Sequence, residues 1–129
     1  MKTEKEIYKN QKEVHDQIVD FVKSNLTKDI KEAYLVGSST TQSFGKYFKK
    51  QRYHEGSDID LVVMVEENKI PKNWKYLGVE KSWWKLYRGG SVKINETIHK
   101  ADLMVVKPGK ESFAHNRMKE LGWKPEKIK

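Results

Sequence analysis

Apolar residues near the start of the chain recur at the spacing of one helix face. Val14, Ile18 and Val22 lie four residues apart. Because the α-helix repeats every 3.6 residues, this pattern predicts a helix with one apolar face over about residues 4–25. A shorter apolar pattern that ends in a glycine predicts a closing helix over residues 111–123.

Short apolar runs in the rest of the chain predict buried strands. The runs are AYLVGS (33–38), DIDLVVMV (58–65) and ADLMVV (101–106), each followed by polar or turn-forming residues. The apolar residues of 58–65 are nearly continuous, which is typical of a central strand buried on both faces. Residues 81–95 are rich in aromatic side chains around Gly89-Gly90, and we interpret them as a β-hairpin that turns at the two glycines.

The segments between these runs complete the expected architecture. Residues 40–50 (TTQSFGKYFKK) are interpreted as a helix capped by Ser39 or Thr40, and residues 67–74 as a loop. The expected order is helix, strand, helix, several strands and a final helix. This order predicts an α+β fold in which helices pack on one mixed sheet.

Size and composition bound the class of protein. The chain has 129 residues, so a single domain over 1–129 is expected. It has no cysteine, which excludes a disulfide framework, a thiolate zinc site and a cysteine nucleophile and fits a reducing compartment. The sequence contains neither an apolar run of membrane-spanning length nor a signal peptide. We therefore expect a soluble, cytoplasmic protein without a membrane partner.

The net charge is strongly positive. There are 26 Lys and Arg residues against 18 Asp and Glu, which gives +8. Two interpretations stay open at this point: a solvated lysine-rich surface, or affinity for polyanions such as nucleic acid and nucleotide phosphates.

Two aspartates at the start of a buried strand are the first candidate for chemistry. Asp58 and Asp60 are two residues apart, so on a strand their side chains project from the same face. Burying two such carboxylates without compensation is costly, and a divalent cation such as Mg²⁺ offsets the repulsion well. Asp102, at the start of another buried strand, would complete a metal site. The simpler alternative is that the acids end the strand and pair with lysines.

A glycine and a serine upstream add a second candidate. Gly37 and Ser38 end the strand predicted over residues 33–38. Backbone N–H groups at such a turn suit an anionic phosphate, and a glycine allows it to approach closely. Alone, this pair is most often a simple turn. Together with three strand-borne acids it favours a nucleotide site.

These segments resemble the nucleotidyltransferase superfamily that includes DNA polymerase β. The shared pattern is an apolar run ending in Gly-Ser, then Asp-apolar-Asp-apolar, then a third Asp on a later strand. Here the matching residues are LVGSS, EGSDIDLVV and KADLMVV, between about residues 33 and 106. The resemblance implies the palm fold of that superfamily, a mixed sheet with helices packed on it.

The resemblance also implies roles for residues. Gly37 and Ser38 would hold the β- and γ-phosphates of an NTP or dNTP, and Asp58 and Asp60 would bind two Mg²⁺ ions, with Mn²⁺ as a substitute. Asp102 would bind the catalytic ion and help to deprotonate the attacking hydroxyl. The implied reaction is two-metal nucleotidyl transfer, in which an acceptor hydroxyl attacks the α-phosphorus and pyrophosphate leaves.

Three further residues are assigned to the nucleotide site, although their sequence motifs are less specific than Gly-Ser and Asp-x-Asp. They are Ser39, Ser57 and Lys46. The segment between Gly-Ser and the acid pair is longer than the family usually has, which leaves open which basic residue contacts the triphosphate. The basic residues of this segment are Lys46, Lys49, Lys50 and Arg52.

The acceptor and the aromatic residues leave alternatives open. The positive charge favours a nucleic-acid acceptor. One alternative is an antitoxin-type minimal nucleotidyltransferase that adenylylates or binds a helical toxin protein, and another is a non-catalytic binder of nucleotides or nucleic acid. Adjacent strand residues face opposite ways, so one of Trp83 and Trp84 is expected in the core. For this pair we favour packing over base stacking.

Overall fold

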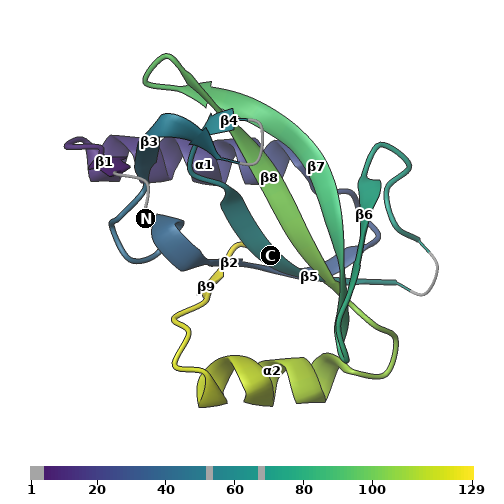
Figure 1. The fold of residues 1–129 in the computed structure, drawn as a ribbon. Coiled ribbons are helices and arrows are strands. Elements are labelled where there is room, and N and C mark those ends of the chain that lie inside the picture. Colours follow the sequence, from purple (N-terminus) through teal and green to yellow (C-terminus); the bar gives the residue numbers. More distant parts are fainter. Residues whose placement is uncertain (1–4, 52–53, 67–68) are drawn as a thin grey trace.

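The computed structural model describes residues 5–51, 54–66 and 69–129. Its elements form two sheets and two helices (Figure 1). The elements are β1 (Lys5–Ile7), α1 (Gln11–Asn25), β2 (Ile30–Val36), a 3-10 turn (Gly37–Ser39), β3 (Gly45–Gln51), β4 (His54–Gly56), β5 (Ile59–Val65), β6 (Lys75–Glu80), β7 (Trp84–Ile94), β8 (Thr97–Val106), α2 (Glu111–Glu120) and β9 (Glu126–Lys127).

The larger sheet is mixed and has the order β6-β7-β8-β5-β2-β9. Strands β5 and β8 are parallel neighbours at its centre, while the other pairings are antiparallel. A smaller sheet has the order β1-β3-β4. This confirms the expected α+β class with a mixed sheet and packed helices.

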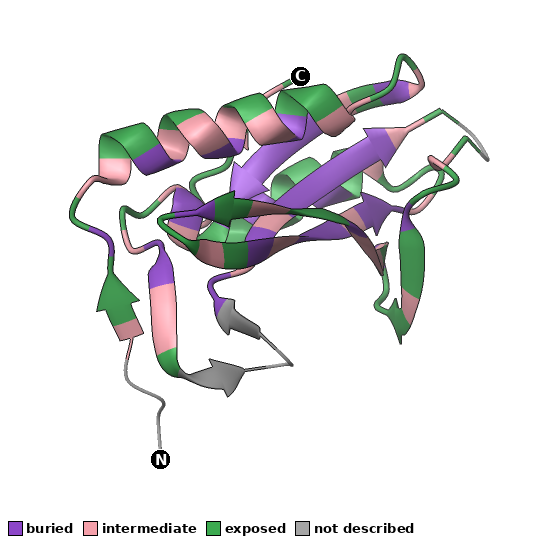
Figure 2. Cartoon of the chain, turned by 90° about the horizontal axis from the view of Figure 1, so that it is seen from above, coloured by how far each residue is buried: buried purple, intermediate pink, exposed green. Residues whose placement is uncertain are grey.

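The two faces of the larger sheet carry different helices. Along β5, Leu61 and Val63 belong to the core with α1, whereas Val62 and Met64 belong to the core with α2. This alternation follows from the two-residue repeat of a strand and explains why the apolar run is continuous. Figure 2 shows α1 with exposed residues on its outer side and buried residues toward the buried strands.

Helix α1 covers one face with residues spaced as predicted. Its buried residues are Val14, Ile18 and Val22. The helix begins at Gln11 rather than near residue 4, because residues 5–7 pair with β3 as strand β1. Helix α2 agrees better with expectation, and Gly122 after its end has the left-handed φ of 70° that favours glycine.

The helix predicted over residues 40–50 is wrong. Residues 45–51 form β3, which pairs with β1 and β4. A Cβ built on Gly45 would lie 1.9 Å from the carbonyl oxygen of Glu6, so the close approach of β1 requires glycine there. Between β2 and β3, the helical conformation is limited to the 3-10 turn at Gly37–Ser39.

The hairpin turn predicted at Gly89-Gly90 is also misplaced. Strand β7 continues through both glycines, and the chain reverses at Asn95 and Glu96, whose φ values are 48° and 66°. Two left-handed residues are typical of a tight hairpin turn. The register with β8 shifts by one residue between Arg88 and Ser91, so the glycines form a bulge.

No helix in the described part of the chain has the length and apolar character needed to cross a membrane.

Candidate active site

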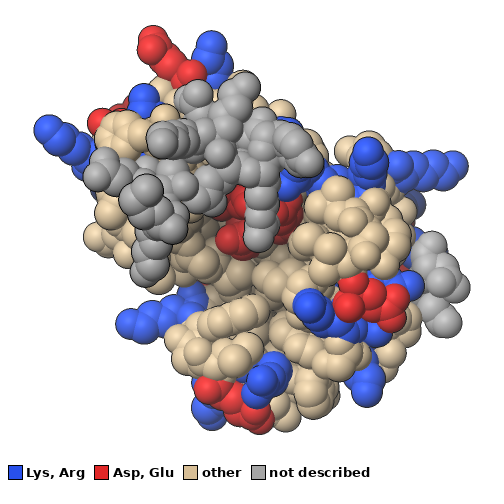
Figure 3. Space-filling model, viewed as in Figure 1, with Lys and Arg blue, Asp and Glu red and all other residues tan. Residues whose placement is uncertain are grey.

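The three acids that the sequence singles out come together at the centre of the sheet. Asp60 on β5 lies opposite Asp102 on β8 in the parallel register, and Asp58 lies just before β5. Each acid offers an oxygen, and these oxygens all lie within 4.8 Å of one another. Figure 3 shows acidic side chains at the middle of this face, beside basic ones.

Strand parity places the acids on the face that carries α2. Asp60 has the parity of Val62 and Met64, which pack against α2, and Asp102 has that of Met104. The helix covers one end of this face (Figure 1), where it packs against Val106 at the end of β8, whereas Asp60 lies near the start of the parallel strand β5. Asp102 is only 4% exposed, whereas Asp58 and Asp60 are partly exposed.

Arg88 holds the third acid, and the sequence did not identify this role. Its Nε and Nη2 groups both donate to Oδ1 of Asp102, at 2.9 and 2.7 Å. Arg88 lies opposite Asp102 in the β7–β8 register, directly before the Gly89-Gly90 bulge. Two glycines inside an apolar, aromatic strand were the available signal, because bulges often redirect side chains next to functional sites.

The turn after β2 lies against the acid pair. Gly37 has φ +75°, and a Cβ built on it would be 2.8 Å from Oδ2 of Asp60. The turn is closed by the N–H of Thr40, which donates to the carbonyl of Gly37 at 3.0 Å. Glycine is therefore required here both by its backbone conformation and by the close approach of a carboxylate.

The three serines assigned to the nucleotide site differ in their surroundings. Ser38 is partly exposed beside Gly37. Ser39 is buried and its hydroxyl donates to the carbonyl of Val36 at 3.3 Å. Ser57 is also buried, and its Oγ accepts the N–H of Gly45 at 3.2 Å. The hydroxyls of Ser39 and Ser57 thus bond within the fold, and that of Ser38 is the more accessible.

Two lysines of the small sheet have acidic partners: Lys46, which was assigned to the nucleotide site, pairs with Glu6, and Lys5 interacts with Asp60. Nζ of Lys46, on β3, is 3.6 Å from Oε2 of Glu6. Burial lowers the pKa of Lys5 below its usual value, while the carboxylate of Asp60 acts in the opposite direction. Lys5 therefore lies within electrostatic reach of the acids, which no sequence motif indicated. Of the other basic residues in this region, the side chains of Lys49, Lys50 and Arg52 lie outside the described ones.

A buried histidine ties β8 to the residue before the acid pair. His99 is 0% exposed, and its Nδ1 is 2.9 Å from the carbonyl oxygen of Ser57. Because a carbonyl only accepts, Nδ1 carries the proton, and in the neutral ring Nε2 accepts from the hydroxyl of Tyr8 at 2.9 Å. Burial raises the pKa of Tyr8, which keeps this hydroxyl protonated. The sequence gave His99 no role because the histidines lack metal-site spacing.

Two pockets open on either side of Asp60, and both are bounded by Trp84 and Met104. We call the first the Trp pocket. It has a volume of about 720 Å³ and is lined by Val36, Gly37, Thr40, Thr41, Gln42, Asp60, Trp84, Met104, Gly122, Trp123 and Lys124. We call the second the Arg88 pocket. It has a volume of about 500 Å³ and is lined by Asp60, Leu77, Val79, Trp84, Leu86, Arg88, Asp102 and Met104.

The acids fit a hard divalent cation. All three donors are carboxylate oxygens, which Mg²⁺ and Mn²⁺ prefer over nitrogen or sulfur. Their mutual distances allow oxygens from different strands to meet on one ion. A cation here would also offset the cost of holding a nearly buried Asp102 beside two other carboxylates.

Comparisons of the chain with models of protein families, with curated proteins and with solved structures gave no match.

Proposed function

We propose that the protein is a nucleotidyltransferase, which moves a nucleoside monophosphate from an NTP or dNTP to an acceptor hydroxyl and releases pyrophosphate. One observation supports the proposal most strongly. Carboxylate oxygens of Asp58, Asp60 and Asp102 lie within 4.8 Å of one another, and the turn that contains Gly37 lies directly against Asp60. This joins the expected metal ligands and the expected phosphate turn in one place. The polymerase β-like character of the fold is part of the same proposal.

The chain's own residues have distinct roles in this reaction. The three aspartates would hold Mg²⁺, which when bound neutralises charge on the phosphates and stabilises the attacking and leaving oxygens. The turn at Gly37 and Ser38 receives the phosphates with its backbone N–H groups. Asp102 accepts the proton of the attacking hydroxyl while the oxygen of that hydroxyl forms a bond to the α-phosphorus. The bond from the α-phosphorus to the bridging oxygen of pyrophosphate then breaks.

Arg88 supports this role of Asp102. Both of its N–H groups bond a single oxygen, Oδ1, so the carboxylate is held in one orientation. Hydrogen bonds between a guanidinium and a carboxylate are charge-assisted and therefore strong, which helps to keep Asp102 in this position.

For the acceptor we propose nucleic acid. The net charge of +8 attracts a polyanionic chain, and Lys5 adds a positive charge within reach of Asp60. If the test below finds no modification of nucleic acid, the alternative acceptor is a protein, such as a helical toxin.

The proposal is tested by incubating the protein with each α-labelled NTP, Mg²⁺ and a panel of RNA, DNA and protein acceptors. Asp60→Asn should abolish transfer and leave the fold intact, because it relieves repulsion between the carboxylates. Asp16→Asn is the matched control, since that carboxylate is 70% exposed on α1. If calorimetry finds equal Mg²⁺·NTP affinity in the wild type and in Asp58→Asn/Asp60→Asn, the metal assignment is wrong.

A further inference from the structure

We propose that the Trp pocket binds the base of the nucleotide, with Trp84 and Trp123 as the residues that hold it. This inference rests on the proposed function, because it places the nucleoside of the same substrate. It adds a part of the site that the acids and the phosphate turn do not include: the chain after α2.

The lining of the Trp pocket is divided by chemistry. Polar groups come from the turn and the acid pair, namely Gly37, Thr40, Thr41 and Asp60. The large apolar contributions are Trp84 and Met104 from the sheet and Trp123 from the chain after α2, with Lys124 next to Trp123. A nucleotide has the same division, since its phosphates are charged and its base is a flat apolar ring with polar edges.

The pocket is continuous with the candidate metal site. Asp60 lines it together with Gly37, and a Cβ built on Gly37 would be 2.8 Å from Oδ2 of that carboxylate. A phosphate bound at the turn would therefore leave the nucleoside directed along the pocket. Its volume of about 720 Å³ lies within the usual range for pockets that take small ligands and cofactors.

The Arg88 pocket suits a base less well. Its walls beyond Trp84 and Met104 are the aliphatic side chains of Leu77, Val79 and Leu86. Its guanidinium already donates twice to Asp102, and the turn at Gly37 does not line it. We therefore assign the Arg88 pocket to the attacking hydroxyl, because Asp102, the proposed proton acceptor, lines it.

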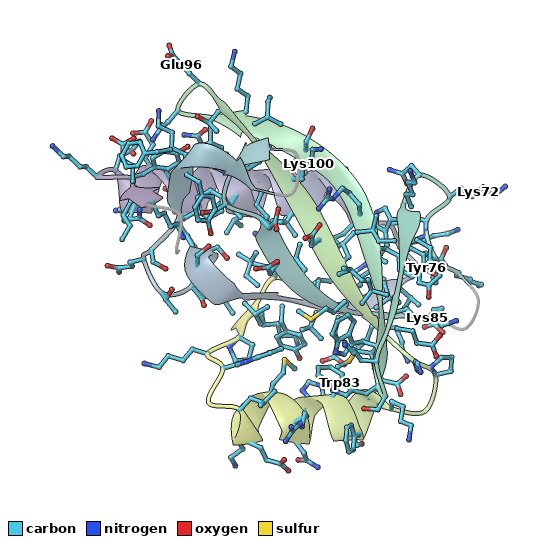
Figure 4. The ribbon with its side chains drawn as sticks, in the orientation of Figure 1. Lys72, Tyr76, Trp83, Lys85, Glu96 and Lys100 are labelled. Atoms are coloured by element: carbon cyan, nitrogen blue, oxygen red, sulfur yellow. The ribbon has the colours of Figure 1, made fainter. Side chains whose placement is uncertain are left out.

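Neither tryptophan is the one that fills the core. Trp83 is 5% exposed and lies between the sheet and α2 (Figure 4), whereas Trp84 and Trp123 are partly exposed. Both lie beside Trp83, with ring centroids 6.3 and 6.4 Å from it. Trp83 thus supports two rings that remain accessible from the pocket. Gly122 follows α2 with a left-handed φ of 70°, and the backbone N–H of Trp123 donates to the carbonyl of Met118 at 3.0 Å, which positions the backbone that carries the second ring.

The test compares a nucleotide with its phosphate chain alone. Calorimetry with Mg²⁺ and no acceptor would measure the affinity of ATP and of inorganic tripolyphosphate for the wild type, Trp84→Leu and Trp123→Leu. Leucine keeps the position apolar and removes the ring. Base stacking on one aromatic residue corresponds to about a 5- to 150-fold change in affinity. We expect a loss of this size for ATP in each variant, while the tripolyphosphate affinity stays within about twofold of the wild type.

Trp74→Phe is the control, because Trp74 belongs to the core on the α1 face of the sheet. Unchanged ATP affinity in both leucine variants would overturn the inference and leave the proposed function standing. Equal losses for ATP and tripolyphosphate would also overturn it, since the rings would then act on the phosphate turn. If the wild type binds neither ligand, both the inference and the proposed function are wrong. Folding of each variant is confirmed by circular dichroism.

Discussion

Glycine is required at position 37 for two reasons, its backbone conformation and the closeness of Asp60, and substitutions at two glycines can separate them. Its φ of +75° disfavours any other residue, and a Cβ would be 2.8 Å from Oδ2 of Asp60. Gly109 has the first constraint alone, with φ +79° and nothing within 4 Å of a Cβ. Both alanine variants should lose roughly 1–2 kcal/mol of stability from the left-handed conformation.

Only Gly37→Ala should also disturb the acids. We expect its Mg²⁺ affinity to fall at least about tenfold, equal to about 1.4 kcal/mol, because the methyl group displaces the carboxylate of Asp60. Urea unfolding and Mg²⁺ titration of Gly37→Ala and Gly109→Ala measure the two effects separately. Wild-type Mg²⁺ affinity in Gly37→Ala would argue against the closeness of this turn to the metal ligands.

The hydroxyl of Tyr8 bonds His99, which in turn bonds the carbonyl of Ser57, the residue before Asp58. Tyr8→Phe removes the donor to Nε2 of His99 in a buried site, which should cost about 1–2 kcal/mol of stability. Because His99 also holds the carbonyl of Ser57, Mg²⁺ affinity should fall several-fold. Tyr76→Phe, 44% exposed on β6, should change neither quantity. Thermal unfolding and metal titration of both variants decide whether the network positions the acid.

The residues of the site were predictable to the extent that they lie in motifs. Asp58, Asp60 and Asp102 begin apolar runs, so their convergence was expected from strand periodicity and from the placement of Asp102 on a neighbouring strand. Arg88 and His99 lie in no such pattern, because their roles come from the β7–β8 register and from a contact over 42 residues. Such partners depend on how strands align, which a local pattern does not determine.

At the scale of elements, the central strands were predictable and the peripheral ones were not. Strand β5 and the second half of β8, residues 101–106, are buried on both faces, so apart from their acids these segments are apolar. Strand β6 is mostly exposed and β3 contains Gly45 among lysines, so neither has a clear two-residue repeat. β3 exists because β1 and β4 pair with it, and this tertiary pairing overrides the weak local preference for a helix.

Gly89 is required by packing within the sheet rather than by a turn. A Cβ there would be 2.4 Å from Cδ1 of Leu103 and 2.9 Å from Nε1 of Trp74. Gly89→Ala should therefore lose about 1–3 kcal/mol of stability through overpacking. Ser91→Ala, an exposed position on the same strand, should be close to neutral. Denaturant unfolding measures both, and equal stability of Gly89→Ala and wild type would contradict the bulge packing.

At the scale of the molecule, one face of the large sheet both packs against a helix and carries the candidate site. Helix α1 covers the opposite face, and α2 covers one end of the face that carries the acids (Figures 1 and 2). The remainder holds the acids and both pockets. The site is thus supported from behind by the α1 core, and two of its proposed metal ligands, Asp60 and Asp102, lie on the central strands β5 and β8.

The charge of the whole molecule predicts how an anionic acceptor would bind. With a net charge of +8, affinity for labelled RNA or DNA oligonucleotides should fall steeply with salt. The slope of log affinity against log salt changes by about 0.7–0.9 for each phosphate contact. Changing Lys49, Lys50 and Arg52 together to Glu should weaken this binding and flatten the slope, while NTP affinity changes less.

Titrations of labelled oligonucleotides at several salt concentrations measure this slope. As a control, Lys23→Glu and Lys119→Glu alter the charge at exposed positions of α1 and α2 instead. Absence of oligonucleotide binding by the wild type at low salt would rule out a nucleic-acid acceptor and favour a protein one.

The parallel pairing of β5 and β8 also bears on which ions the site would accept. Asp60 and Asp102 start from directly opposite backbone positions, so their separation is set by the spacing between strands, about 4.8 Å in any sheet. Substitutions elsewhere do not change that spacing without breaking the sheet. Asp58 lies outside the strand, so its backbone is the adjustable member of the set. Selection among cations of different radius would therefore act through the short segment that carries Asp58, while the two strand acids stay constant.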